Sequence, residues 1–417
     1  MGPDGERLRK LSGAISDAQK PVRVLRALAW PDEVKADFFA RGARELPRVS
    51  YEAPRFDPAA QAVRLRELAA SLDAGQEVER LLAETCESYA IAAEMLGAVG
   101  TRRFWELSQR LYGRPESISC DGRTTNLALA QHFDEVLAHY PLLARPTGED
   151  TLSAEEAAPL LEARLAEFFR ERPPRVEVVD ELTANAVAGA DAVKLRRDAR
   201  FSQRDIAQLE HHEGHVHVAT TRNGRAQPVL PCLGHGAPRT TRTQEGLATF
   251  TEFLSHTIDL ERVHRLTNRI LAIQLAEEGA SFLDLYRFFQ ERGESEAGAF
   301  ESARRVCRGG MLEGGAPFTK DVCYLDGFVR VANFLRVALT RGRADLVELL
   351  FVGKLDLSDL PALVALRSAG LLAAPRFMPL WARDLSFLTA YMAWSSFLDQ
   401  THLEGTEEVH ADTLSRA

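Results

Sequence analysis

Histidines are concentrated in one short segment of this 417-residue chain. Five of the eleven lie between residues 211 and 235. The densest part, EHHEGHVH (210–217), contains an H-E-x-x-x-H pattern formed by His212, Glu213 and His217. The related pattern H-E-x-x-H places two zinc-binding imidazoles on one helix face, with the glutamate as general base. The segment therefore predicts a metal site with His212 and His217 as ligands and Glu213 as the catalytic base.

The spacing of the two histidines requires a distorted helix. At about 100° per residue, positions four apart on an α-helix differ by about 40°, and positions five apart by about 140°. Side chains about 140° apart cannot both reach a metal ion at about 2.0–2.1 Å. We therefore expect a π-bulge, which absorbs one extra residue and recurs at functional sites. Gly214 lies within this turn and lowers the helix preference, so the distortion costs less.

A third ligand is expected from the next helix. A hydrolytic zinc site needs three protein ligands and one open position. The segment TQEGLA (243–248) is predicted to open a helix, with Glu245 in its first turn. Two antiparallel helices joined by a loop could bring this carboxylate to His212 and His217. Two histidines and a glutamate, with a second glutamate beside the first ligand, are the arrangement expected of a zinc peptidase.

Other interpretations of the cluster stay open. His211 and His215 are four residues apart and could be the metal pair, groups that orient the site, or surface residues. The cluster could also bind haem or iron, or trap metal ions without any enzymatic role. Cys232 lies between the two ligand helices and could offer a thiolate, but we prefer a structural cysteine because the ligand set is already full.

Several motifs resemble those of a known family. They are HEGHVH (212–217), RNGRAQP (222–228), QEGLA (244–248), FTKDVCYLDGF (318–328) and GKLDLSDLPAL (353–363). Together they resemble the QEGLA-motif family, whose bacterial members are called flavohaemoglobin expression-modulating proteins and whose eukaryotic relatives include the microtubule-associated tyrosine carboxypeptidases. The resemblance spans roughly residues 175–385. It implies Zn²⁺ held by His212, His217 and Glu245, with Glu213 as catalytic base, but it does not supply the substrate.

These residues lead to one expected function and one alternative. We expect a zinc-dependent metallohydrolase, a metallocarboxypeptidase that hydrolyses a peptide bond at the C-terminus of a peptide or protein. Glu213 would take a proton from zinc-activated water and pass it to the leaving amine. The alternative is a non-catalytic metal-binding regulatory or interaction protein. The intact Glu213 favours the enzyme, because a structural metal site needs no general base.

The segment 308–330 holds the candidates for contacts with substrate. Tyr324 is the candidate catalytic donor to the developing oxyanion. Arg308, Lys320 and Arg330 are candidate substrate-binding residues, since a carboxypeptidase needs a cation for the terminal carboxylate. Arg308 precedes two glycines, where the backbone could approach a ligand closely, and Lys320 is one of only six lysines. Each of these charges could instead be an ordinary surface or salt-bridged charge.

The elements that would position these residues are mainly helical. We expect an α+β fold with a zinc-peptidase-like core, in which a small sheet lies beside the HExxxH helix. Predicted helices cover 58–71, 76–98, 154–172, 203–221 and 243–256, and predicted strands cover 175–179 and 186–196. The strand at 186–196 could be an edge strand that pairs with an extended peptide, or an internal strand without such a role. The expected regions are a flexible tail (1–20), an N-terminal helical region (21–172) and a metallopeptidase core with C-terminal helices (173–417).

Composition excludes several other classes of protein. The net charge is −9 and the pI is about 5.8, so a general nucleic-acid binder is not expected. No uncharged apolar stretch reaches about 18 residues, and the first residues do not resemble a secretory signal, so neither a membrane nor secretion is expected. The five cysteines form no C-x-x-C pair, which predicts reduced thiols and a cytoplasmic location. The sequence does not indicate an oligomeric state.

Overall fold

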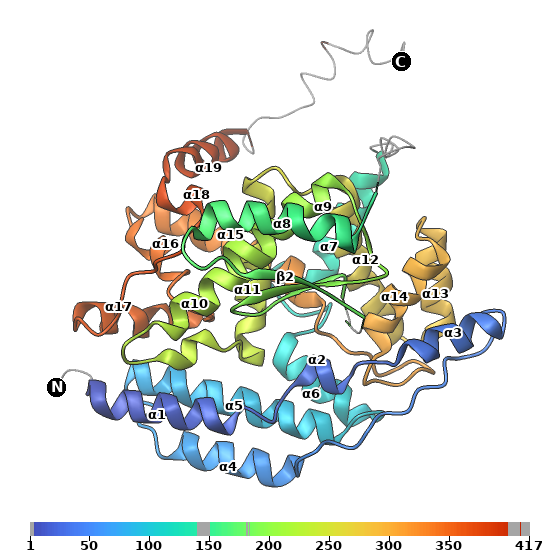
Figure 1. Cartoon of the computed structure of the whole chain (residues 1–417), viewed down its shortest axis with the longest axis horizontal. Helices are drawn as coiled ribbons and strands as arrows, with labels where there is room; N and C mark the ends of the chain where they lie inside the picture. Colours follow the sequence, from blue (N-terminus) through green and yellow to red (C-terminus); the bar gives the residue numbers. More distant parts are fainter. Residues whose placement is uncertain (1–3, 140–150, 181, 183, 399–408, 410–417) are drawn as a thin grey trace.

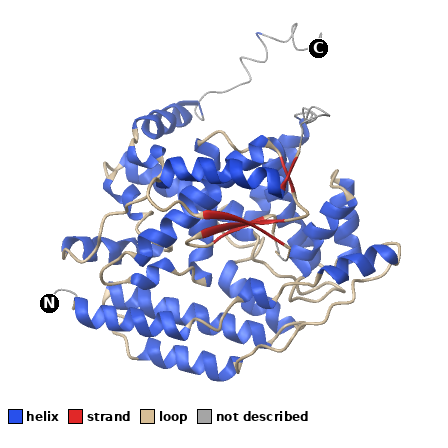
Figure 2. Cartoon of the chain, in the orientation of Figure 1, coloured by secondary structure: helices blue, strands red, loops and turns tan. Residues whose placement is uncertain are grey.

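The computed structural model describes residues 4–139, 151–180, 182, 184–398 and 409. The described chain is mainly helical, with a few short strands near its centre (Figure 2). This agrees with the expected mainly helical α+β class. Before the three-stranded sheet the helices are α1 (Gly5–Ala18), α2 (Val24–Ala27), α3 (Asp32–Ala40), α4 (Pro58–Ala70), α5 (Glu77–Gly97), α6 (Arg102–Tyr112), α7 (Asn126–His139) and α8 (Ala154–Phe169).

The helices that follow the sheet form the rest of the molecule. They are α9 (Gln203–Leu209), the π-helix η1 (Glu210–Val218), α10 (Ala219–Arg225), α11 (Thr241–Leu254), α12 (Leu260–Glu277), α13 (Phe282–Glu291), α14 (Glu296–Cys307), α15 (Val322–Thr340), α16 (Asp345–Leu349), α17 (Leu360–Ser368), α18 (Leu380–Arg383) and α19 (Ser386–Leu398). Three 3₁₀ turns, η2 (Pro231–Gly234), η3 (Pro238–Thr240) and η4 (Leu357–Asp359), lie in the connections. Among the described residues, no helix is both long and apolar enough to cross a membrane.

The expectation of a flexible tail over residues 1–20 is wrong for the part that the structure describes. Asp4 caps α1 by accepting hydrogen bonds from two backbone N–H groups, as favoured at helix starts. Leu8 and Ile15 are each only 2% exposed and belong to the same hydrophobic core as Val216 of η1. Helix α1 packs with α4 and α5 along one side of the molecule (Figure 1). Residues 1–3 lie outside the described residues.

The three-stranded sheet corrects one predicted element. The segment expected as a single strand at 186–196 forms two antiparallel strands, β3 (Ala186–Ala188) and β4 (Ala192–Arg196). Strand β2 (Arg175–Val179) pairs with β4 in parallel, so the order is β2-β4-β3 and β3 is an edge. Two further strands, β1 (Leu152–Ser153) and β5 (Arg200–Phe201), form a separate pair. Helix α8 packs against β2, and β3 lies against η1.

The helix that carries the H-E-x-x-x-H pattern is distorted where the sequence requires it. Ser202 caps α9, with Asp205 returning the bond in a capping box, which confirms the predicted start. Helix α9 then continues into the π-helix η1 over Glu210–Val218, so the predicted distortion is present, as a π-helix of nine residues. Gly214 also has a packing reason, because a Cβ there would lie 2.3 Å from Leu165 of α8.

The helix of the QEGLA segment is held by a very close crossing with α15. A Cβ on Gly246 of α11 would lie 2.1 Å from the backbone of Gly327 in α15. Two glycines at one crossing let the helix backbones approach each other closely. Helix α11 also packs against η1. The close crossing with α15 therefore helps to hold Glu245, the residue before Gly246, against η1. The glycine of QEGLA therefore serves to position its glutamate.

We expect Gly246→Ala to destabilise the protein. The added methyl group meets backbone atoms, which cannot move aside as a flexible side chain can, and overpacking typically costs about 1–3 kcal/mol. Thermal or urea unfolding measures the change. Gly13→Ala is the matched control, because Gly13 is also helical and has nothing within 4 Å of its added Cβ; there we expect no loss. Equal stability of the Gly246→Ala and wild-type proteins would contradict this packing argument.

Candidate active site

The structure brings the three predicted ligands together. The Oε2 atom of Glu245 lies 3.5 Å from Nε2 of His212 and 3.6 Å from Nε2 of His217. In a tetrahedral site with metal–ligand distances of about 2.0–2.1 Å, neighbouring ligand atoms lie roughly 3.4 Å apart. The separations therefore fit one metal ion of zinc's size, and the donor set of two imidazoles and a carboxylate suits zinc.

The π-helix is what makes this convergence possible. Its hydrogen bonds run from residue i to i+5, so His212 and His217, five positions apart, occupy the same face. Their ring centroids lie 4.9 Å apart and the rings are nearly perpendicular. Thr220, one turn further on, donates a hydrogen bond from its hydroxyl to the side-chain oxygen of Gln244. This buried contact links the η1–α10 helix to the start of α11.

His212 is oriented by a carboxylate that the sequence reasoning missed. Glu252 is fully buried, and its Oε1 atom lies 2.6 Å from Nδ1 of His212. Arg262 donates two hydrogen bonds of 3.0 Å to the same carboxylate. The Nδ1–H of His212 therefore points at Glu252, which leaves Nε2 free to face Glu245. Glu252 follows Glu245 by seven positions on α11 and so lies on the same face, a spacing that was readable from the sequence.

The charges at the site are arranged for binding a cation. Although burial alone would raise the pKa of Glu245, Lys320 and the two histidines hold it well below its usual range. Burial lowers the pKa of His217. Burial would also lower the pKa of His212, but Glu245 and Glu252 raise it to about 10. The two carboxylates thus favour a protonated, positively charged His212. A bound metal cation can replace that added proton.

Glu213 lies beside the three ligands and is held by the sheet. The backbone N–H of Ala188, in the edge strand β3, donates a 3.0 Å hydrogen bond to Oε2 of Glu213. The Oε1 atom lies 3.9 Å from Nε2 of His212, close to the ligand group without belonging to it. One carboxylate oxygen is therefore fixed by the backbone, and the other remains available for proton transfer.

These residues open onto a pocket of about 420 Å³, a size that accommodates a small ligand or a peptide end. It includes the three ligands, Glu213 and the edge strand β3. Basic side chains outnumber the two carboxylates in its lining: they are Arg23, Arg26, Arg305, Arg308, Lys320 and Lys354. A pocket with this charge balance favours an anionic ligand.

The four candidates from segment 308–330 occupy different positions. Arg308 and Tyr324 both line the pocket. Lys320 also lines it, but its Nζ contacts Oε1 of Glu245 at 3.1 Å, so it orients that ligand as well. Arg330 is not among the residues that line the pocket; it pairs with Asp326 on the preceding turn of α15 at 2.9 Å. The structure therefore does not support Arg330 as a substrate-binding residue.

Arg308 is the best placed of the basic groups to meet a ligand. It is 3% exposed, its guanidinium lies over the ring of Phe318, and its buried Nε atom has no hydrogen-bond partner. Burial lowers its pKa to about 10, and the neighbouring Arg305 adds to this effect. A buried cation with an unused donor is costly unless an anion completes its contacts.

Lys354 is a second pocket residue that sequence reasoning missed. It lines the same pocket as Arg308 and the ligands, and burial lowers its pKa although Glu245 and Glu213 oppose that change. The available signal was the scarcity of lysine, which had singled out Lys320.

Cys232 is buried near Ser12, whose side chain accepts a hydrogen bond from the backbone N–H of Cys232. Cys232 belongs to neither of the two groups of side chains in the described chain that could hold a metal ion. This agrees with a structural cysteine.

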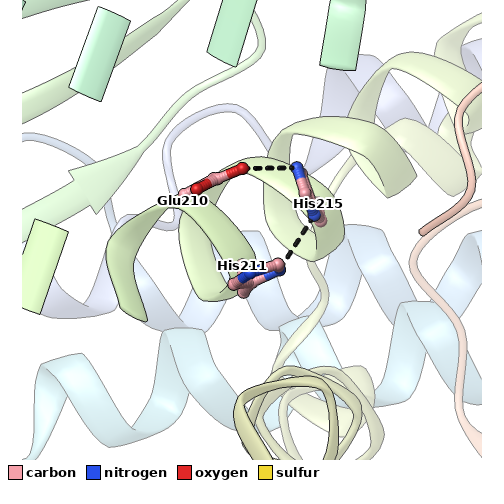
Figure 3. Close-up of side chains that lie close together, drawn as sticks. All are labelled: Glu210, His211 and His215. Atoms are coloured by element: carbon pink, nitrogen blue, oxygen red, sulfur yellow. Dashed lines mark hydrogen bonds and ion pairs between the residues drawn. The ribbon is translucent and has the colours of Figure 1, made fainter. Parts of the chain in front are cut away.

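His211 and His215 do not belong to the group of ligands formed by His212, His217 and Glu245, which is called the first group below. They lie near Glu210 in a separate group on the same π-helix (Figure 3). The two groups share no residue, so the predicted ligand pair and the alternative pair are both present, each with its own glutamate.

We expect Glu252→Gln to weaken metal binding without abolishing it. The amide keeps the shape, but it removes the charge that fixes the His212 tautomer, and losing such a partner typically costs about 10–100-fold in metal affinity. Competition with a chromophoric zinc chelator measures the affinity. Arg204→Gln is the control, since Arg204 pairs with Asp259 at the surface, 3.4 Å away. An unchanged affinity in Glu252→Gln would show that this carboxylate does not support the ligand.

Comparisons with known proteins bear on this site. No curated protein matches the chain. One solved structure, titled "the putative lipoprotein from Colwellia psychrerythraea", is 14% identical with a TM-score of 0.39, and the match covers 79% of this chain but only 66%, less than two thirds, of that one. A family model described as microtubule-associated tyrosine carboxypeptidase matches residues 36–400, which include the three ligands, Glu213 and every pocket residue except those at 22–26. The chain therefore belongs to the microtubule-associated tyrosine carboxypeptidase family.

Proposed function

We propose that the protein is a zinc-dependent metallocarboxypeptidase that removes residues from the C-terminus of a peptide or protein. One observation carries the proposal: Glu213 lies beside the convergent His212, His217 and Glu245, in a pocket where basic side chains outnumber acidic ones. The family match supports the carboxypeptidase class. The ligand geometry supports zinc.

The residues of this chain divide the work of hydrolysis. When bound, zinc supplies Lewis-acid chemistry, which makes water nucleophilic near neutral pH. Glu213 accepts the proton of the attacking water on its available oxygen and then delivers it to the leaving amine. The Ala188 N–H, bonded to the other oxygen, keeps the carboxylate aimed during both transfers. Glu252 and Lys320 keep His212 and Glu245 in place.

Tyr324 is suited to stabilise the negative charge that develops on the carbonyl oxygen. It lines the pocket, and Arg305 lines it as well. A tyrosine hydroxyl can donate its O–H proton to an oxyanion. Lys320 lies 5.1 Å from the ring centroid. A positioned donor of this kind stabilises the oxyanion more than it stabilises the neutral carbonyl.

Arg308 and Lys354 are suited to hold the terminal carboxylate of the substrate. Arg308 has an unused buried donor, and a guanidinium can bind a carboxylate through two parallel hydrogen bonds. Because Arg305 already makes two bonds to Asp321, it is less free to do so. Binding the chain end would place the last peptide bond near Glu213, which distinguishes a carboxypeptidase from an enzyme that cuts within a chain.

The proposal is tested by digesting matched peptides with the metal-loaded protein. A peptide library with free C-termini, and the same library with C-terminal amides, are digested and read by mass spectrometry. We expect stepwise loss from free C-termini and little or no cleavage of the amides. Cleavage within chains at equal rates in both libraries would refute a carboxypeptidase. A protein that binds zinc and cleaves neither library would be the non-catalytic metal-binding alternative.

We expect Arg308→Gln to weaken turnover of free-acid peptides and so to reduce the preference of the enzyme for free-acid over amidated peptides. Losing a charge-assisted contact to a carboxylate costs about 1.5–3 kcal/mol, or roughly tenfold or more in kcat/KM. Arg330→Gln is the matched control, because this arginine lies outside the pocket and we expect no selective effect. If Arg308→Gln lowers both rates equally, Arg308 is not the carboxylate anchor.

A further inference from the structure

The π-helix carries a second group of metal-ligating side chains that the proposed hydrolysis does not use. Glu210, His211 and His215 each offer one ligand atom, and these atoms lie within 4.8 Å of one another. Figure 3 shows the three side chains gathered on η1, with dashed lines that join His215 to Glu210 and to His211. His211 and His215 alternate along the helix with the first pair, His212 and His217, so the two groups occupy different faces.

The contacts of His215 are incomplete without a ligand. Its Nδ1 atom lies 3.0 Å from Nδ1 of His211, and its Nε2 atom lies 3.5 Å from Oε1 of Glu210. The Nε2 atom is buried and has no hydrogen-bond partner, and the residue is only 8% exposed. The 3.5 Å separation equals the shorter imidazole–carboxylate separation in the first group, and it suits two ligands of one ion.

Neighbouring side chains from α8 hold two of the three residues in place. Arg164 donates a 3.1 Å hydrogen bond to Oε2 of Glu210, which leaves Oε1 facing His215. The ring of His215 stacks on Phe168, with centroids 3.9 Å apart. Ligating carboxylates and imidazoles commonly have such supporting contacts. His211 is less buried than His215, and one ligand atom of each of the three residues already lies within 4.8 Å of the others.

We propose that Glu210, His211 and His215 form a second metal site, which takes a divalent transition-metal ion such as Zn²⁺. Two imidazoles and one carboxylate favour zinc and its neighbours over Mg²⁺ or Ca²⁺, which prefer oxygen ligands. The site shares no ligand with the candidate catalytic group. It is therefore independent of the proposed function, and both ions can bind one chain at the same time. The positive charge of Arg164 partly neutralises the negative charge of Glu210. This site therefore binds a cation more weakly than the first site.

The experiment counts the ions bound by the full chain. The protein is stripped with a chelator and dialysed to equilibrium against Zn²⁺ of stepped concentration, and bound zinc is measured by mass spectrometry. We expect two equivalents in the wild type and one in His211→Asn and in His215→Gln. Glu245→Gln removes a ligand of the first group. This variant should keep the one equivalent of zinc that binds to Glu210, His211 and His215. His235→Asn is the control, because His235 belongs to neither group and should keep both equivalents.

Three results would overturn the second site. In the first, the wild type binds a single equivalent of zinc, and Glu245→Gln loses it. In the second, His211→Asn and His215→Gln still bind two equivalents. In the third, the control His235→Asn loses the second equivalent as those two variants do. Because His215 is buried, its variant is checked by circular dichroism. The less buried His211→Asn gives the same count if His215→Gln does not fold. Co²⁺ provides a second readout, since each occupied site adds its own visible absorption.

Discussion

Glu213→Gln is expected to lower turnover by about 10²–10⁴-fold, the usual contribution of a general base, while zinc binding and stability stay close to those of the wild type. Gln has nearly the same shape as Glu and can still accept the hydrogen bond from the Ala188 N–H through its oxygen. It cannot accept a proton. The effect should therefore appear in kcat more than in KM, because the substrate is bound by other residues.

The measurement is the steady-state rate on a free-acid peptide, with metal content determined on the same sample. Glu177→Gln is the matched control, because Glu177 lies on β2 of the same sheet and makes only long ion pairs, with Arg175 at 3.5 Å and Lys194 at 4.0 Å. Full activity of Glu213→Gln on a peptide that the wild type cleaves would show that the proposed hydrolysis is wrong. The histidine cluster would then need another explanation.

Glu245→Gln is expected to lose the metal itself, and with it all measurable turnover. The change removes the only anionic ligand of the first group, and an amide oxygen is a weaker partner for zinc than a carboxylate. It also leaves the buried Lys320 without the negative charge of its 3.1 Å partner, which adds to the instability of the site. The expected order of metal affinity is wild type, then Glu252→Gln, then Glu245→Gln.

Metal content is measured in a background that carries His211→Asn and His215→Gln, so that only the first group is counted. Lys320→Met serves as a control for the broken ion pair, since it removes the cation but keeps the carboxylate. We expect Lys320→Met to retain zinc. If Glu245→Gln holds a full equivalent in this background, Glu245 is not a ligand. Its position beside the two imidazoles would then have a purely structural reason.

Sequence patterns predicted the features that depend on neighbouring residues. A five-residue spacing between His212 and His217 cannot serve one metal on a straight helix, so the pattern itself required the π-helix that the structure shows over Glu210–Val218. The capping box at Ser202 also depends on residues close in sequence, and it is present. Glu245 was predicted from its place at the start of the next helix, and it reaches the two imidazoles.

Sequence patterns were a poorer guide to features that depend on contacts between segments far apart in the chain. The segment at 186–196 alternates like one strand, yet it turns back on itself as β3 and β4, and the distant strand β2 pairs with the other side of β4. The first residues look like a polar tail, but Leu8 and Ile15 find apolar partners more than 60 residues away. Arg330 was grouped with Arg308 by sequence proximity alone, and the turn of α15 directs it to Asp326.

By itself, the sequence determined the chemistry available to this protein: two imidazoles and one carboxylate on a helix that must widen, and a third ligand in the helix that follows. Tertiary structure alone decided which atoms meet. It aims Nε2 of His212 through Glu252, gives Oε2 of Glu245 to the imidazoles by occupying Oε1 with Lys320, and brings Lys354 into the pocket. The physical reason is that ligand types and helix periodicity are local properties of the chain. Burial, charge pairing and the approach of Gly246 to Gly327 depend on segments that meet only when the chain folds.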